Sequence, residues 1–204
     1  MREAVVVRET TLQDAEAVAA LQATCFPPPF PAEALFTAKH VRQHVERFAT
    51  GQFVATAGGV VVASATNMLM QQADWEAHRP WDKSVGGLDL PRHDPEGSVL
   101  FGVDISVAPD WRRCGLGRRL YKERFRLVRH LGLVLYGTVC RTPGYSESGL
   151  ATPNAYVESV CRGASTDRTL TPLLRMGLDC KGVIDNYMED CESGDAGVVL
   201  EWRP

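Results

Sequence analysis

The chain has 204 residues, of which 45% are hydrophobic and 23% are charged, and its formal net charge is -3. This length suits one domain that buries its own core, and the weak negative charge argues against nucleic-acid binding by the molecule as a whole. No apolar run reaches the length of a membrane-spanning helix. We therefore expect residues 1–204 to form a single domain with no membrane partner.

Six cysteines are spread along the chain without a Cys-x-x-Cys pair, which argues against a zinc or thioredoxin-like site. They are Cys25, Cys114, Cys140, Cys161, Cys180 and Cys191. The first ten residues alternate and carry acids, so they lack the pattern of a secretory signal peptide. Because free thiols are typical of a reducing compartment, we expect a cytoplasmic protein.

The first third of the chain predicts a strand, two helices and a hairpin. Residues 3–9 have the composition of a strand, and Thr10 or Thr11 is placed to cap a following helix. A second amphipathic helix is predicted over 32–50, with Gly51 ending it. Residues 52–68 then predict two strands joined around Gly58 and Gly59.

Residues 71–97 have no clean periodicity, although they contain Trp75 and Trp81. A segment this long inside a compact domain is often functional, and its aromatic residues indicate order. We interpret it as an insertion on the side of the acceptor substrate. Its histidines, His78 and His93, lack metal-ligand spacing with the nearby aspartates, so no metal is predicted.

The stretch 98–111 predicts a strand that Pro109 ends. Its odd-numbered positions from Val99 to Val107 are apolar, while Gly102, Asp104 and Ser106 share the other face. A glycine turn, a helix over 116–131 and Gly132 as its stop come next. The chain then continues with a strand over 133–140 and a short helix over 152–163. It closes with the end of one more helix and two late strands. This order predicts a mixed α/β (α+β) domain around one sheet.

The glycine turn, Arg112-Arg-Cys-Gly-Leu-Gly117, is the stretch that points most directly to chemistry. Amide N–H groups at a helix start have no partner within the helix, and a diphosphate satisfies them. Glycines let phosphate approach, and arginines add forked donors. Residues 112–129 carry a local charge of +7, against -10 for the rest of the chain. The turn is no P-loop, because it lacks Gly-Lys-Ser/Thr, and Leu120 replaces the third glycine of a dinucleotide fingerprint.

The stretch "VAPDWRRCGLGRRLY" resembles the signature of the GNAT superfamily of N-acetyltransferases, whose loop is Gln/Arg-x-x-Gly-x-Gly/Ala. "LLRMGL" and the opening "VRETTLQDAEAVAAL" are similar to later and earlier family stretches, so the resemblance covers most of the chain. "YVESVCRG", "GVIDNYMED" and "ESGDAGVVLEW" look like GNAT domains fused to carbon–nitrogen hydrolases. The resemblance implies a mainly antiparallel, twisted sheet flanked by helices.

The resemblance also implies where acetyl-coenzyme A (acetyl-CoA), the cosubstrate, binds. The pantetheine arm would lie along the backbone of Ile105, Ser106 and Val107, as an added strand edge. One of these amides would polarise the thioester carbonyl. The loop that would hold the pyrophosphate comprises Arg112, Arg113, Cys114, Gly115, Leu116, Gly117 and Arg118.

Asp104 is our candidate for the base that takes the proton of the attacking amine, because burial in mid-strand raises a carboxyl pKa. A matching acid occurs in some members of the family, although many carry Glu one residue earlier, where this chain has Val103. The alternative is that Asp104 is a structural hydrogen-bond acceptor. Cys114 is interpreted as a small filler, since direct transfer needs no thiol nucleophile.

The acid that protonates the departing thiolate is harder to assign. Many members place a tyrosine four residues before the late glycine, which is Gly177 here, and that position holds Leu173. Tyr145 and Tyr187 are the substitutes. Each is also explained as a packing or surface tyrosine.

The acceptor is predicted to be a small-molecule or peptide amine. The acidic stretch 185–195 would attract a cationic amine if it lies near the cleft, and is otherwise a solvated turn. Trp75 and Trp81 would instead clamp an apolar or cationic group. Two alternatives stay open: a non-catalytic module that binds or senses acyl-CoA, and an interaction domain that uses the basic helix. The acidic remainder of the chain counts against nucleic acid. The resemblance also allows a homodimer, which is common in the family.

Overall fold

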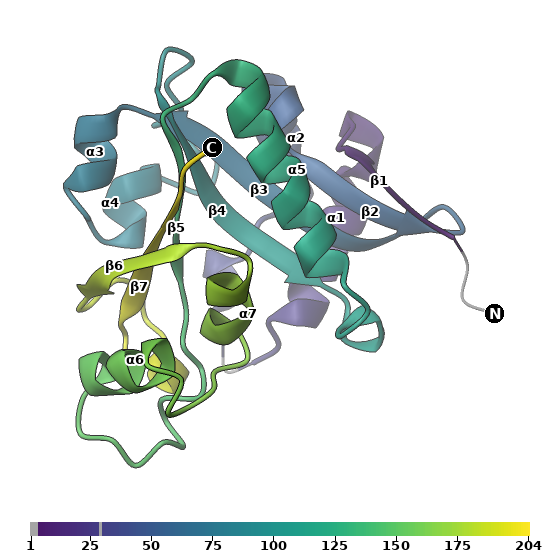
Figure 1. Ribbon diagram of the computed structural model, residues 1–204. Coiled ribbons are helices and arrows are strands. Elements are labelled where there is room, and N and C mark those ends of the chain that lie inside the picture. Colours follow the sequence, from purple (N-terminus) through teal and green to yellow (C-terminus); the bar gives the residue numbers. More distant parts are fainter. Residues whose placement is uncertain (1–3, 29) are drawn as a thin grey trace.

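The computed structural model describes residues 4–28 and 30–204, and this part of the chain forms one seven-stranded sheet between two layers of helices (Figure 1). The strand order is β1-β2-β3-β4-β5-β7-β6. Neighbouring strands are antiparallel except for the parallel pair β4 and β5. The strands are β1 Val5–Glu9, β2 Phe53–Ala57, β3 Val60–Met70, β4 Val99–Val107, β5 Leu135–Cys140, β6 Asp179–Ile184 and β7 Gly197–Trp202. The predicted fold class is confirmed.

The helices cover both faces of the sheet. They are α1 Ala15–Cys25, α2 Ala38–Phe48, α3 Gln72–Glu76, α4 Trp81–Val85, α5 Leu116–Leu131, α6 Pro153–Cys161 and α7 Leu170–Arg175. The three late helices, α5 to α7, share the largest core cluster and lie on one face, in front of the sheet in Figure 1. The first four pack on the other face, in two smaller clusters.

Helix α5 has the bounds that the sequence predicts, because a glycine in the left-handed region stands at each end. Gly115 precedes it with a φ of 80°, and Gly132 follows it with a φ of 65°. Its buried stripe includes Leu116, Leu120 and Val128, spaced four and eight residues apart. The helix is thereby fixed against the sheet with its first turn at the end of β4.

The segment 71–97 contains α3 and α4 and contributes to the core. Trp75 is buried, its ring lies 5.8 Å from that of Phe101, and its Nε1 donates to Glu201 Oε1 at 2.8 Å. Gly137 makes room for it, since a Cβ there would lie 2.8 Å from the indole ring. Trp75 therefore packs inside the protein and does not present its ring to an acceptor, contrary to our interpretation from the sequence.

His44 ties α2 to this segment. It is buried, its Nε2 donates to the carbonyl of Leu88 at 2.6 Å, and its ring meets Phe36 edge-on. Burial lowers the pKa of His44 to about 4, although the bond to Leu88 acts in the opposite direction. The imidazole is therefore neutral in the folded protein at physiological pH.

We expect this histidine to make stability depend on pH. Between pH 6.5 and 4 the unfolded chain binds a proton at His44 that the folded protein excludes, so stability falls as the pH is lowered through this window. The free energy of unfolding should drop by about 3 kcal/mol more than in His44→Gln, which retains a hydrogen-bond donor but does not titrate. Urea unfolding at several pH values checks this, and equal pH slopes for the two proteins would contradict it.

Candidate functional site

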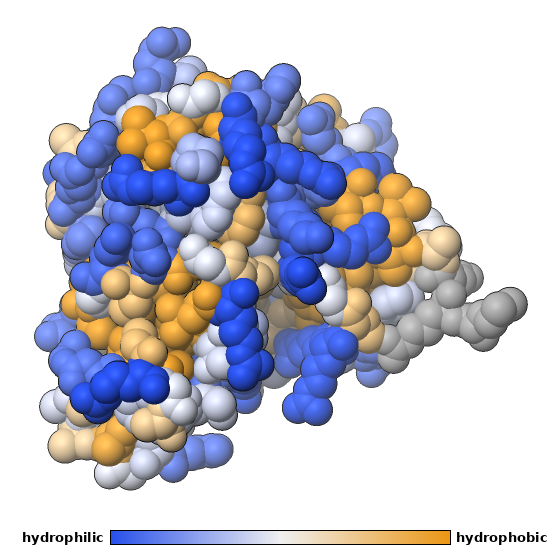
Figure 2. All heavy atoms as spheres, viewed as in Figure 1, coloured by the Kyte–Doolittle hydropathy of each residue, from blue (hydrophilic) through white to orange (hydrophobic). Residues whose placement is uncertain are grey.

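Strands β4 and β5 separate in the middle of the sheet. Their parallel pairing covers only Val99–Gly102 against Leu135–Thr138, although β4 continues to Val107 and β5 to Cys140. Figure 1 shows the two strands diverging toward the loop that precedes α5, and Figure 2 shows the surface hollowed at this opening. The divergence leaves one edge of β4 without a neighbouring strand.

A β-bulge in β4 decides which side chains face which layer. Its register against β3 shifts at Thr66/Asn67, so Val103 is the extra residue between the pairs Thr66–Asp104 and Asn67–Gly102. Val103 packs with the clusters under α1 to α4, whereas Ile105 and Val107 pack with the α5 cluster.

The predicted alternation along β4 is therefore wrong beyond Val103. Because the bulge reverses the alternation, Asp104 and Ser106 point to the α1 side, and they no longer share a face with Gly102. A bulge depends on how two strands pair, so one strand's sequence does not reveal it.

The backbone groups of β4 also have defined directions. The N–H of Ala108 donates to the carbonyl of Val62 on β3 at 2.9 Å. Because the direction alternates along an antiparallel strand, the backbone groups of Ser106 and Asp104 point toward β3. Those of Ile105 and Val107 point to the side that β5 has left. Of the three residues predicted to line the pantetheine arm, two present their backbone there and Ser106 does not.

The glycine loop lies where β4 leads into α5. Arg113 and Gly115 have φ values of 59° and 80°, which turn the chain sharply into the helix. The first α-helical bond of this turn is donated by Arg119 to Gly115, so the three preceding amides lie outside the ladder. Those amides belong to Leu116, Gly117 and Arg118.

This loop fits a diphosphate. A Cβ built on Gly115 or Gly117 would meet nothing within 4 Å, so the space beside these two residues is open. The side chains of Arg112, Arg113 and Arg118 are exposed around it. Arg112 also donates its Nε to the carbonyl of Val107 at 3.2 Å, which joins the loop to the open edge of β4.

Cys114 is exposed, and its Sγ lies 3.4 Å from the carbonyl of Arg112. The thiol thus lies within the loop itself. Its interpretation as a small filler stays a prediction.

Asp104 is half-buried beside the opening, on the side of α1. Ser106 Oγ donates to its Oδ2 at 3.1 Å. Burial raises the pKa of Asp104, and hydrogen bonds from Gln22 and Ser106 together with the charge of Arg124 oppose part of that rise. The structure thus gives Asp104 the raised pKa that a proton acceptor needs.

Cys25, the last residue of α1, is close enough to Asp104 and Arg112 for their charges to act on it, and burial raises the pKa of its thiol. Gln22, one turn earlier, accepts from the N–H of Phe36 at 2.6 Å through its Oε1. The end of α1 therefore forms a wall beside Asp104. No local signal in the sequence points to Gln22 or Cys25, because this contact joins segments about eighty residues apart.

Neither candidate tyrosine is joined to Asp104 by a hydrogen bond within the described residues. Tyr187 is buried after β6 against Gly197, and burial raises its pKa strongly. Tyr145 is half-buried, and its hydroxyl lies 3.4 Å from the carbonyl of Ala151. Leu173 is buried in the core. A role of Tyr145 or Tyr187 as the acid stays a prediction.

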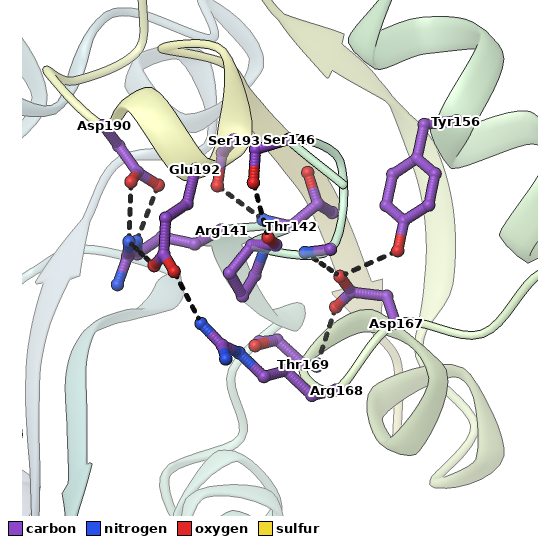
Figure 3. A network of polar contacts seen from close by, with 12 residues as sticks. Arg141, Thr142, Ser146, Tyr156, Asp167, Arg168, Thr169, Asp190, Glu192 and Ser193 are labelled. Carbon is purple, nitrogen blue, oxygen red and sulfur yellow. Dashed lines mark hydrogen bonds and ion pairs between the residues drawn. The ribbon is translucent and has the colours of Figure 1, made fainter. Parts of the chain in front are cut away.

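A polar network ties the loop after β5 to the loop between β6 and β7 (Figure 3). Arg141 donates to both carboxylate oxygens of the buried Asp190 at 2.7 and 2.6 Å and also reaches Glu192 at 2.9 Å. Although burial raises it, the pKa of Asp190 is held below its usual value by Arg141. Arg168 adds a second cation to Glu192 at 3.0 Å.

Asp190 and Glu192, two of the five acidic residues in 185–195, are therefore already paired with arginines. This leaves less negative charge for a cationic acceptor than the sequence indicates.

The same network fixes the chain beyond β5. Ser193 Oγ accepts from the N–H of Thr142 at 2.9 Å, and Asp167 accepts from Gly144 at 3.0 Å and from the Tyr156 hydroxyl at 3.2 Å. Burial, followed by the charge of Asp167, raises the pKa of Tyr156 to about 12. These hydrogen bonds hold residues 142–144 in place beyond the end of β5.

Within residues 4–28 and 30–204, no cluster of three or more histidine, cysteine or acidic side chains is placed to hold a metal ion. In the same part of the chain, every helix is too short or too polar to cross a membrane.

Comparison with known sequences gives a family match. The profile of the "Acetyltransferase (GNAT) family" matches residues 15–143, which include β4, the glycine loop and α5. YkwB of Bacillus subtilis (strain 168), described as an uncharacterized N-acetyltransferase, is 34% identical over 204 residues, covering 98% of this chain and 89% of YkwB.

YhcX of the same organism, described as a probable hydrolase, is 28% identical over 97% of this chain. The match spans only 38% of YhcX. The chain thus resembles one part of a longer protein, which confirms the expected likeness to domains fused to hydrolases.

Comparison with solved structures shows the same fold. The loading GNATL domain of CurA from Lyngbya majuscula superposes with a TM-score of 0.84 at 16% identity, over 98% of both chains. The GphF GNAT-like decarboxylase in complex with isobutyryl-CoA superposes with a TM-score of 0.79 at 23% identity, over 97% of this chain and 98% of that one.

Proposed function

The chain belongs to the GNAT family of acetyltransferases, and from that membership we propose that it transfers the acetyl group of acetyl-CoA to the nitrogen of an amine. The observation that carries the proposal is the continuity between the opening of the sheet and the glycine loop. The open edge of β4 ends directly in the loop whose amides and arginines suit a diphosphate. A molecule that carries a diphosphate, an amide-bearing arm and a thioester in that order fits both the glycine loop and the open edge of β4.

The residues of the opening have complementary roles in this proposal. The loop from Arg112 to Arg118 binds the pyrophosphate through main-chain N–H groups and arginines. The backbone of Ile105 and Val107 orients the arm, and the Ile105 N–H donates to the thioester carbonyl. Asp104 accepts the proton that the attacking amine loses.

The reaction then needs no covalent enzyme intermediate. The amine nitrogen bonds to the acetyl carbon, the carbon–sulfur bond breaks, and the thiolate takes up a proton to leave as a thiol. Holding both reactants in one opening supplies much of the acceleration. The acceptor enters on the α1 side, where the half-buried carboxylate of Asp104 lies, and we propose a small-molecule or peptide amine.

Release of the free thiol of coenzyme A, measured over a panel of amines, tests the proposal. We expect thiol release that depends on both acetyl-CoA and one class of amine, with the acetylated amine confirmed by mass spectrometry. Tight binding of acetyl-CoA without release would favour the non-catalytic module. Loss of carbon dioxide from a carboxylated acyl-CoA, without amine acetylation, would assign the decarboxylation named for the GphF structure.

A further inference from the structure

Arg124 is an arginine in the buried stripe of α5, at the spacing of Leu120 and Val128. It is 1% exposed. Its guanidinium donates to the Tyr136 hydroxyl at 2.9 Å, to the carbonyl of Thr66 at 3.2 Å and to the carbonyl of Asp104. It also lies 4.9 Å from the centre of the Tyr121 ring.

Within the described residues, no ion pair includes Arg124. Its Nε is buried without a hydrogen-bond partner. A buried charge is costly unless it is well bonded, so an apolar residue at this position would serve packing at least as well. The charge of Arg124 therefore serves its hydrogen bonds to two strand carbonyls, those of Thr66 and Asp104.

Those carbonyls belong to the strand pair at the bulge. Thr66 and Asp104 are the last partners of β3 and β4 before the register shifts, and β5 leaves β4 at Gly102, two residues away. Arg124 thus holds the backbone at the point where the sheet opens.

The bond to Asp104 fixes a peptide plane. In a trans peptide the C=O and the following N–H point in opposite directions. With the Asp104 carbonyl held by Arg124 on the β3 side, the N–H of Ile105 is directed away from β3, and it also lies within hydrogen-bonding reach of the Asp104 carboxylate. In the proposed function, this amide donates a hydrogen bond to the thioester carbonyl.

We propose that Arg124 is a positioning residue, which locks the Asp104–Ile105 peptide so that the Ile105 N–H polarises the thioester carbonyl of bound acetyl-CoA. The inference rests on the proposed function. Because polarisation depends on the direction of one amide, a small rotation of this plane weakens it without removing the binding site.

The infrared stretch of the carbonyl of acetyl-CoA labelled with 13C at that carbon tests this inference without a known acceptor. In the unmodified protein we expect binding to lower the carbonyl frequency. In Arg124→Met, which replaces the charge by an apolar side chain, the frequency should return toward that of free acetyl-CoA. Affinity should change less than about threefold, because the glycine loop is untouched.

Two conservative variants protect the test against misfolding. Arg124→Lys retains the charge without the fork, and Tyr136→Phe removes one acceptor of Arg124 but leaves the ring. Both should shift the frequency part of the way. Arg126→Met is the matched control, because Arg126 is exposed on the same helix and pairs with Glu123, and it should behave like the unmodified protein.

The outcomes separate this inference from the proposed function. If the unmodified protein does not bind acetyl-CoA, the proposed function fails. If acetyl-CoA binds and the carbonyl frequency is the same in the unmodified protein and in all folded Arg124 variants, the positioning role is refuted while acetyl-CoA binding stands. Circular dichroism identifies the variants that are folded.

Discussion

Replacing Gly117 by leucine is expected to weaken acetyl-CoA binding by about 100- to 1,000-fold, the equivalent of losing two hydrogen bonds to a charged group, while the protein stays folded. Gly117 has helical backbone in the first turn of α5, and a Cβ there meets nothing within 4 Å. The protein itself therefore accommodates a side chain at this position. A leucine would occupy the space in front of the helix amides, where we place the pyrophosphate.

Isothermal titration calorimetry and thermal unfolding measure the two halves of this prediction. Gly117→Ala should give an intermediate loss of affinity, because its side chain fills less of the space. His130→Leu places the same side chain on the exposed far end of α5 and should leave affinity unchanged. Full affinity in folded Gly117→Leu would show that the pyrophosphate does not bind at this loop.

Asp104→Asn is expected to lower the turnover of amine acetylation by about 100- to 10,000-fold, the usual range for a lost general base. The side chains have nearly the same shape, so acetyl-CoA binding and the fold should persist. The pKa of Asp104 is raised by burial, so the turnover of the unmodified protein should fall as the pH drops through that raised pKa. The variant should lack this limb of the pH profile.

The control is Asp110→Asn, because Asp110 is an exposed acid in the turn between β4 and α5. It should retain the activity and the pH profile of the unmodified protein. Near-normal turnover in Asp104→Asn would leave Asp104 as a structural acceptor for Ser106 and Gln22, which is the alternative that the sequence leaves open.

The sequence predicts those parts of the fold that depend on local signals. Gly115 and Gly132 mark both ends of α5, and the glycine spacing within one turn is enough to indicate the family. Strands β6 and β7 follow from short β-rich runs near the end of the chain. Each of these features is determined by residues that are neighbours in the chain.

Features that depend on pairing between distant segments could not be predicted. The bulge at Val103 requires the register of β3 against β4, and it moves Asp104 to the α1 face. The spacing of Arg124 from Leu120 and Val128 places it in the buried stripe of α5, but its bonds to the carbonyls of Thr66 and Asp104 depend on distant strands. The Arg141–Asp190 pair joins residues 49 positions apart, and no local pattern announces it.

A crystal structure of the protein with coenzyme A tests the central claim most directly. We predict the pyrophosphate against the amides of Leu116 to Arg118, and the pantetheine arm beside Ile105 and Val107, between β4 and β5. Coenzyme A seated elsewhere on the protein, with the opening between these strands and the glycine loop both free of it, would contradict the account.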